Sequence, residues 1–121
     1  MPKQNHGFVN TDEHRGIRFM RAVVAECDFI PYDLCEYSDQ QIKELYLGIE
    51  GLLKKKEILL FVSPYMTANQ MHQIRMGFVS GLSFETIESY ANPKIDEDEM
   101  RSIRQKNISE KKISHRNLIY S

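Results

Sequence analysis

The stretch Thr67-Ala-Asn-Gln-Met-His-Gln-Ile-Arg75 decides the fold, because similar stretches recur before and after it. One repeat later lies Asp96-Glu-Asp-Glu-Met-Arg-Ser-Ile-Arg104, and one repeat earlier lies Ser38-Asp-Gln-Gln-Ile-Lys-Glu-Leu-Tyr46. Earlier still lies Asn10-Thr-Asp-Glu-His-Arg-Gly-Ile-Arg18. Self-similarity at a period of about 29 residues is typical of tandem helical repeats. The sequence therefore predicts four degenerate units that start near residues 10, 38, 67 and 96.

Each unit begins with a residue that can cap a helix and carries Glu or Gln three positions later. The four pairs are Asn10/Glu13, Ser38/Gln41, Thr67/Gln70 and Asp96/Glu99. In such a capping box each side chain accepts a hydrogen bond from the backbone N–H of the other residue. We therefore expect a helix to begin after each cap, which stabilises it by about 1 kcal/mol.

Apolar residues then recur at helical spacing, as in Met71 and Ile74, which places one buried stripe on each helix. Gly51 and Gly81 are expected to end their helices in the left-handed conformation, which glycine adopts without steric cost. Asn107 is the next-best residue for this role in the last unit. Each unit should therefore turn back on itself after its first helix.

A shorter second helix is expected after each turn, over residues 54–62, 84–91 and 110–120. The middle one should end before Pro93, because a residue that precedes proline avoids the helical backbone conformation. In the first unit Pro31 falls where the second helix would run. We therefore expect that segment to be irregular or displaced.

The composition fits one folded domain of 121 residues, with 41% hydrophobic and 27% charged residues. No strand-like alternation of useful length occurs, so the predicted fold is all-α, with about four helix-turn-helix-like repeats stacked in one compact domain. That domain should span residues 10–121, after a loose segment over residues 1–9. The longest apolar run, residues 58–62, is too short to cross a membrane, and no signal segment opens the chain. We therefore expect a cytoplasmic protein without membrane contact.

The third unit contains Asn69-Gln-Met-His-Gln-Ile-Arg-Met-Gly77 and ends with Tyr90-Ala-Asn-Pro93. It resembles a tandem repeat, roughly Gln-Met-x-x-Ile-Arg-x-Gly followed by Gly-Leu and Tyr-Ala-x-Pro, in proteins of gut Firmicutes and of their phages and integrative elements. By this pattern the second unit lacks one residue between Gly48 and Gly51, and the fourth loses three before Asn107. The resemblance implies a helical repeat in a phage or mobile-element setting, and it carries no catalytic residues.

Arginines recur at one repeat position, at Arg18, Arg75 and Arg104. One interpretation is a ladder of guanidinium groups along a groove that takes carboxylates or phosphates. The other is that each arginine lies over the neighbouring hairpin and pairs with an acid such as Glu85 or Glu99. The second is favoured, because repeated positions in stacked units usually serve the contact between units.

Basic residues gather in one lysine run and along the C-terminal segment, where they could meet a protein or a nucleic acid. In a DNA-binding hairpin the second helix enters the major groove, but the best-formed unit presents Glu85 and Glu88 there, which a duplex would repel. The candidate binding residues are Lys54, Lys55, Lys56, Arg75, Arg101, Arg104, Lys111, Lys112 and Arg116.

Aromatic residues supply a second kind of candidate. Tyrosines that prove exposed would be good anchors in a protein interface. The four tyrosines in question are Tyr32, Tyr37, Tyr46 and Tyr65.

No nucleophile with a base, carboxylate pair or metal-ligand set occurs at a spacing that specifies a site, so no catalysis, metal or cofactor is expected. The leading hypothesis is a non-enzymatic helical-repeat protein that binds another protein, in particular a phage or mobile-element inhibitor of a host defence complex such as an anti-CRISPR. The alternative is a DNA-binding helix-turn-helix regulator with nucleic acid as its partner. Self-assembly stays open, because the ends of a repeat array expose apolar faces unless they are capped.

Overall fold

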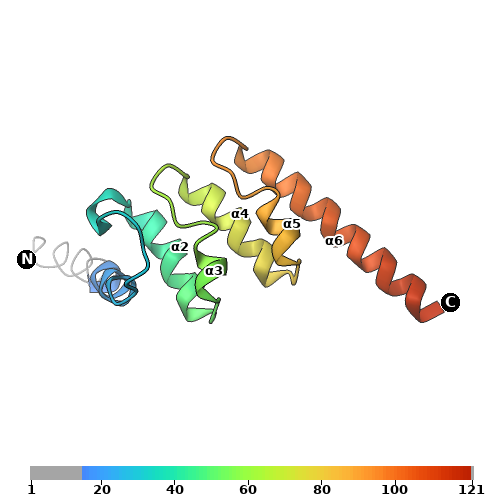
Figure 1. The fold of residues 1–121 in the computed structure, drawn as a ribbon, viewed down its shortest axis with the longest axis horizontal. Helices are drawn as coiled ribbons and strands as arrows, with labels where there is room; N and C mark the ends of the chain where they lie inside the picture. The colour runs from blue at the N-terminus through green and yellow to red at the C-terminus, as the bar shows by residue number, and fades with distance from the viewer. Residues whose placement is uncertain (1–14, 121) are drawn as a thin grey trace, which may run out of the picture.

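The computed structural model of this chain describes residues 15–120, with side chains up to residue 113. These residues form helices and no strand, so the all-α prediction is confirmed for them. The segment 1–9 and the pair Asn10/Glu13 lie outside the described residues. A helical stretch over residues 15–25 is followed by η1 (Leu34–Glu36), α2 (Asp39–Glu50), α3 (Lys55–Ile58), α4 (Ala68–Val79), α5 (Phe84–Glu88) and α6 (Glu97–Tyr120) (Figure 1).

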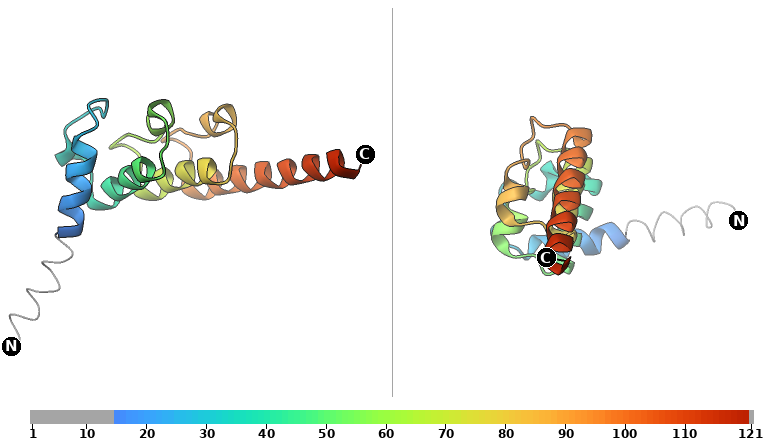
Figure 2. Two further views of the ribbon diagram at one scale, coloured as in Figure 1. Left: turned by 90° about the horizontal axis from the view of Figure 1, so that it is seen from below. Right: turned by 90° about the vertical axis from the view of Figure 1, so that its right-hand side faces the viewer.

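The long helices α2, α4 and α6 lie side by side in a row, with α4 between the other two (Figure 1). The short helices α3 and α5 lie on one side of this row, each packed against the long helix that precedes it (Figure 2). The helical residues 15–25 lie across one end of the row, and α6 continues past its neighbours at the other end. One end of the row is therefore covered by a crossing helical segment, and at the other end a long helix extends beyond the row (Figures 1 and 2).

The long helices begin where the capping boxes predict. Ser38 N donates to Gln41 Oε1 at 2.7 Å, and Gln41 N donates to Ser38 Oγ at 3.2 Å. Thr67 and Gln70 form the same two bonds, at 2.8 and 3.0 Å. At the start of α6, Glu99 N donates to the Asp96 carboxylate at 2.8 Å. These three helix starts are confirmed.

The same glutamines also hold the loop that leads into the next long helix. Each side-chain amide donates to two backbone carbonyls, with Gln41 Nε2 bound to Pro64 O (3.2 Å) and Met66 O (2.6 Å) and Gln70 Nε2 bound to Pro93 O (3.0 Å) and Ile95 O (2.7 Å). Glutamine can do both because its amide oxygen accepts while its amide nitrogen donates. We call this paired interaction the glutamine clamp.

An arginine takes the place of the clamp before α2. Arg21 donates to the carbonyls of Leu34 at 2.9 Å and Tyr37 at 3.0 Å. It also pairs with Asp39 at 2.9 Å. Each long helix from α2 onward is therefore preceded by a loop whose carbonyls are held by the side chain of an earlier helix.

The turn after α2 corrects two predictions, that Gly51 is left-handed and that one residue is missing between Gly48 and Gly51. Gly51 has φ −77°, and the left-handed residue is Leu52 at φ 60°, as Gly81 is at φ 78° after α4. The hydrogen bonds of the two turns also match: Leu52 N to Ile49 O and Leu53 N to Gly48 O after α2, and Gly81 N to Phe78 O and Leu82 N to Gly77 O after α4. Leu52 lies one full repeat before Gly81, so no residue is missing from this unit.

The two hairpins close where an aromatic ring meets a helical glycine. A Cβ added to Gly48 would lie 2.8 Å from Phe61 Cζ, and one added to Gly77 would lie 2.3 Å from Tyr90 Oη. Both rings are 0% exposed, and Tyr90 Oη donates to the Gln73 carbonyl at 3.1 Å. Only glycine lets the ring approach the helix this closely.

The predicted turn at Asn107 and second helix over 110–120 are wrong, because α6 is continuous from Glu97 to Tyr120. The Asn107 side chain donates to the Ile103 carbonyl at 2.8 Å within the helix. Lys106 stands one full repeat after Gly77, so the helical glycine on which an aromatic ring packs in α2 and α4 is not repeated in α6.

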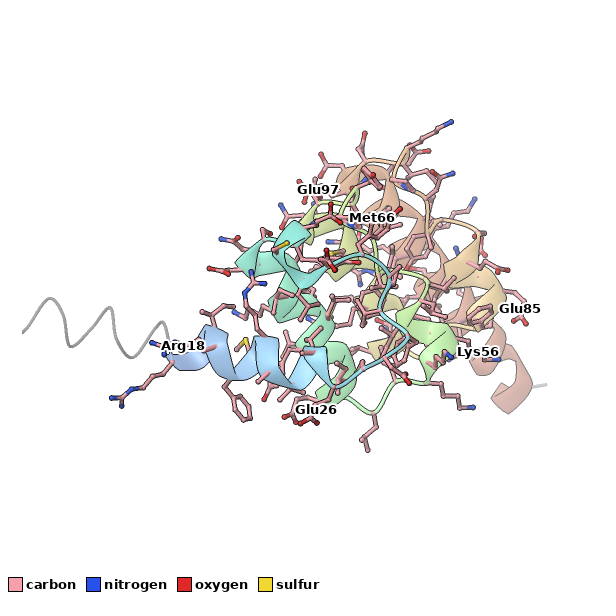
Figure 3. All side chains as sticks on the ribbon, turned by 60° about the vertical axis from the view of Figure 1, so that its left-hand side comes forward. Arg18, Glu26, Lys56, Met66, Glu85 and Glu97 are labelled. Carbon is pink, nitrogen blue, oxygen red and sulfur yellow. The ribbon has the colours of Figure 1, made fainter. Side chains whose placement is uncertain are left out.

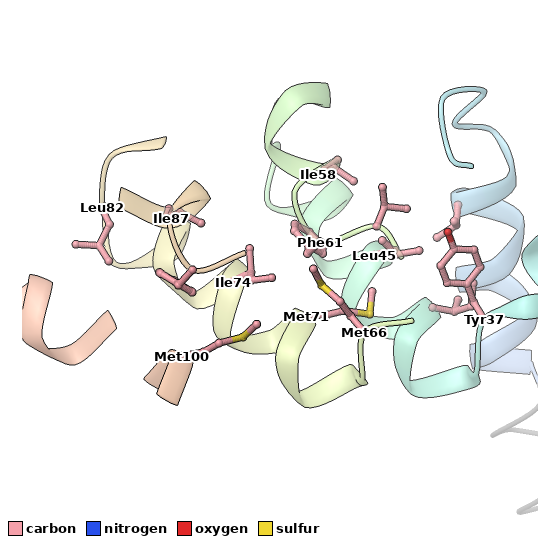
Figure 4. Close-up of a cluster of buried hydrophobic side chains, with 14 residues drawn as sticks. Tyr37, Leu45, Ile58, Phe61, Met66, Met71, Ile74, Leu82, Ile87 and Met100 are labelled. Atoms are coloured by element: carbon pink, nitrogen blue, oxygen red, sulfur yellow. The ribbon is translucent and has the colours of Figure 1, made fainter. Parts of the chain in front are cut away.

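The second helices are shorter than predicted, since α3 ends at Ile58 and α5 at Glu88 and turns follow both. The irregular segment predicted around Pro31 is confirmed, because residues 27–33 contain no helix. The buried cluster runs along the whole row and includes Met71, which the helical spacing predicts as core, and Met100 at the same position of the next repeat (Figure 4). The repeat pattern thus predicts which residues are buried more reliably than it predicts where the helices end.

Gln70→Glu tests the glutamine clamp. The carboxylate keeps the acceptor for the Thr67 N–H but loses the two donated bonds and brings a charge into a site that is 7% exposed. We expect the free energy of unfolding, measured by urea denaturation, to fall by at least about 2 kcal/mol. Glu99→Gln is the matched control and should change it little, because no loop follows α6 within the described residues. Equal losses in the two variants would contradict the clamp.

Gly77→Ala tests the closure of the hairpin. The added Cβ would collide with Tyr90 and Ile87, so we expect a loss of about 1–3 kcal/mol of unfolding free energy. Gly16→Ala is the control, because nothing lies within 4 Å of its added Cβ. There alanine should stabilise the helix by up to about 1 kcal/mol. Thermal unfolding of both variants would separate the effect of packing from that of helix propensity.

Candidate functional site

Two of the three repeated arginines, Arg75 and Arg104, contribute to contacts between long helices, whereas Arg18 is exposed. Arg75 Nε donates to Glu44 Oε2 at 2.6 Å, and these side chains are only 13% and 12% exposed. At the equivalent position one unit later, Arg104 Nε donates to Gln73 Oε1 at 3.2 Å. These bonds join α4 to α2 and α6 to α4. The interpretation as a contact between units fits both residues, although the acid that pairs with Arg75 is neither of the two predicted.

Three of the candidate lysines contact other parts of the chain although they are exposed. The contacts are Lys55 Nζ over the Phe29 ring at 5.5 Å, Lys56 Nζ over the Phe84 ring at 4.9 Å, and a bond from Lys111 Nζ to the Gly81 carbonyl. Cation–π contacts at exposed sites contribute about 0.5–1 kcal/mol each. These lysines therefore stabilise the fold as well as carrying surface charge.

The other candidates are spread over separate elements. Lys54 is the cap of α3 and Lys112 is exposed on α6, while Arg101 pairs with Asp98 at 3.2 Å. Arg116 belongs to α6, but its side chain lies outside the described residues. The structure therefore does not gather the nine basic candidates into one surface.

The four candidate tyrosines divide into buried and exposed. Tyr37 is buried, and Tyr46 is half-buried and donates to Glu50 at 2.7 Å. Tyr32 and Tyr65 are 51% and 73% exposed. Their rings meet edge to face, with centroids 5.8 Å apart. The exposed pair thus joins the loop before η1 to the loop before α4.

The backbone next to Tyr32 is anchored by a buried side chain. Tyr37 Oη donates to the Pro31 carbonyl at 2.8 Å, which anchors the residue before Tyr32 on a buried ring. Burial raises the pKa of Tyr37 to about 12, with smaller contributions from Tyr32 and Glu36. Tyr32 has φ 68°, a left-handed conformation that costs a non-glycine residue about 1 kcal/mol or more. Its exposed ring is held at the surface despite this strain.

Tyr65 is fixed by the glutamine clamp. It stands between the two carbonyls that Gln41 binds, and its own N–H donates to Ser63 Oγ at 3.1 Å. Lys94 stands at the equivalent point of the next unit, and its N–H donates to Asn92 Oδ1 at 2.9 Å. Each clamp therefore presents one exposed side chain between two fixed carbonyls.

An open groove of about 480 Å³ lies beside Tyr65, between the first turns of α2 and α4. Its walls include polar side chains from both turns, among them Ser38, Gln40, Thr67 and Asn69. The Ser38 and Thr67 side chains already accept helix N–H groups, so the groove offers mainly hydroxyl and amide groups. We call Tyr32, Tyr65 and this groove together the tyrosine face.

Sequence reasoning missed the donor role of Gln41 and Gln70 and the pairing of Tyr32 with Tyr65. One local signal for the clamp existed, because glutamate would have satisfied the capping box and glutamine was present instead. The tyrosine pair had no such signal, because the two residues lie far apart in the sequence.

Comparison with known proteins gave no family, no curated protein and no solved structure that matches this chain. Within the described part of the chain, no helix is long and apolar enough to cross a membrane. The same part holds no group of three or more His, Cys, Asp or Glu residues suited to one metal ion.

Tyr32→Gly tests whether Tyr32 serves folding. Glycine adopts the left-handed conformation without strain, which offsets the loss of about 0.5–1.5 kcal/mol from the contact with Tyr65. We expect the free energy of unfolding in urea to change by less than about 1 kcal/mol. Tyr37→Ala, which empties a buried site, should lose about 3–5 kcal/mol. A comparable loss in Tyr32→Gly would assign Tyr32 to the fold.

Proposed function

We propose that this chain is a non-enzymatic array of four degenerate helical units that binds another protein through the tyrosine face. The observation that carries this proposal is the exposed pair of Tyr32 and Tyr65, with both backbones anchored by buried groups. Tyrosine is enriched among the residues that dominate protein interfaces, because a rigid ring gives a large contact area at low entropic cost. A strained, exposed Tyr32 stabilises the fold little, which favours a role in binding.

The arrangement of the units supports the same proposal. Residues 38–66 and 67–95 share the capping box, the clamp, the left-handed turn and the glycine–aromatic closure. The first unit, with Arg21 in place of a glutamine, and the last, with the continuous α6, are then the atypical end units that a repeat array requires. Arrays of this kind expose extended surfaces that other macromolecules can occupy.

The resemblance to phage and mobile-element repeats directs the choice of partner. A small protein from such an element meets the defence complexes of its host in the cytoplasm. We therefore propose a host defence complex as the first partner to test, with inhibition of the anti-CRISPR kind as the expected effect.

DNA binding is the second candidate, favoured by the exposed lysines of α3 and by the basic C-terminal half of α6. Its weakness lies in the second helices, which have only 4 and 5 residues. A recognition helix reads bases with several side chains along its length. Here α5 exposes Glu85 and Glu88, and the Glu85 side chain points outward from the helix (Figure 3). Phosphates would be repelled from this helix.

Photo-crosslinking from position 65 tests the proposal in the cells that make the protein. Benzoylphenylalanine in place of Tyr65 keeps an aromatic ring there and should give adducts that resist nuclease and are destroyed by protease. The same group in place of exposed Gln105 on α6 is the matched control and should give few adducts. Nuclease-sensitive adducts would favour the DNA-binding candidate. Equal labelling from both positions would remove the tyrosine face as the binding surface.

A further inference from the structure

We propose that the tyrosine face binds an extended basic segment of the partner protein, with an arginine side chain stacked on one ring of the Tyr32–Tyr65 pair. This inference rests on the proposed protein-binding function and specifies the chemistry of the partner. It is carried by the charge around the tyrosine face, the geometry of the two rings and the polar groups of the groove.

The charged side chains around the tyrosine face are mainly acidic. Those near Tyr32 and the start of α2 are Asp33, Glu36 and Asp39, and those beyond the groove at the start of α6 are Asp96, Glu97, Asp98 and Glu99. Glu97 is tied to the groove itself, because Asn69 Nδ2 donates to its carboxylate at 3.4 Å. The acids thus flank the groove on both sides.

The bases of this edge do not cancel its charge. Arg21 is bound to Asp39 and to two backbone carbonyls, and Arg101 pairs with Asp98. Lys94 is the third base of this edge, exposed between the two carbonyls that Gln70 binds. Asp33 and Glu36 beside Tyr32 are exposed as well. The edge therefore carries an excess of negative charge that a cationic segment complements.

The two rings favour arginine over lysine. A guanidinium group is planar, stacks on an aromatic face and still donates to a carboxylate at its edge, whereas an ammonium group is a compact, strongly hydrated charge. Tyr32 and Tyr65 are more than half exposed and meet edge to face, and Asp33 directly follows Tyr32 in the chain. One arginine can therefore contact a ring and a carboxylate together.

The groove favours an extended segment. In the first turns of α2 and α4, Ser38 and Thr67 each accept one helix N–H group, and the excess of acidic side chains at this edge disfavours an anion. The side-chain amides of Gln40 and Asn69 remain at the groove and can bond the peptide groups of an extended chain. A volume of about 480 Å³ accommodates only a short stretch of such a segment.

The probe for this proposal is a fluorescein-labelled ten-residue peptide of alternating Arg and Gly, titrated with the full chain by fluorescence anisotropy. Matched peptides carry Lys or Glu in place of Arg. We expect the arginine peptide to bind about threefold or more tighter than the lysine peptide, and the glutamate peptide not to bind. An increase in salt from about 50 to 200 mM should weaken the binding, because the charges are exposed.

Variants of the chain locate the binding. Tyr65→Ala should weaken the arginine peptide by about three- to tenfold, and the double variant Asp33→Asn with Glu36→Gln should weaken it and reduce its salt dependence. The matched control is Glu85→Gln with Glu88→Gln, which removes two exposed carboxylates from α5 and should change nothing. All the changed side chains are exposed, so the variants should fold, which circular dichroism checks.

Equal binding of the arginine and lysine peptides, or equal weakening by the two double variants, would overturn the proposal, since either result indicates unspecific attraction between charges. Failure of the arginine peptide to bind would overturn it as well. If position 65 still crosslinks to a protein in that case, the partner's segment is not basic and the protein-binding function stands. If neither occurs, both proposals fail.

Discussion

A single glutamine side chain joins local to tertiary structure at the start of α2 and again at the start of α4. Its amide oxygen accepts the backbone N–H of the cap residue three positions earlier. Its amide nitrogen donates to carbonyls 23 and 25 residues further along the chain. Both glutamines are buried, so a partner lost here would leave polar groups out of reach of water. The loop that places each next long helix is therefore held by this residue, while the apolar stripes of the helices pack in the buried cluster.

At the two ends of the row, other residues stand in place of the glutamine clamp. Before α2, Arg21 holds the loop carbonyls and adds an ion pair with Asp39, so an arginine serves where no glutamine is available. At the other end Glu99 stands in the glutamine position, where capping alone is required because no loop follows within the described residues. Lys106 stands where α2 and α4 have the helical glycine, and α6 continues as one helix.

The two glutamine clamps have the same hydrogen bonds but hold different exposed residues between their bound carbonyls. The residue between the two bound carbonyls is Tyr65 in one unit and Lys94 in the next, and both are exposed. Its backbone is fixed by neighbouring residues, and its side chain differs between the two loops. Two of the repeated arginines, Arg75 and Arg104, instead contact a neighbouring long helix. At these positions the residue that recurs serves packing, and the residue that differs lies at the exposed surface.

The sequence by itself determined the features that depend on neighbours within one or two helical turns: the caps at Ser38 and Thr67, the helical periodicity that buries Met71 and Met100, and the irregular segment at Pro31. The tertiary structure decided the rest. Leu52 takes the left-handed position because the hairpin keeps its register, and α6 continues through the turn expected at Asn107. The partner of Arg75 and the pairing of Tyr32 with Tyr65 join residues that are distant in the sequence. Such contacts depend on how the helices pack, and a local pattern carries no information about that.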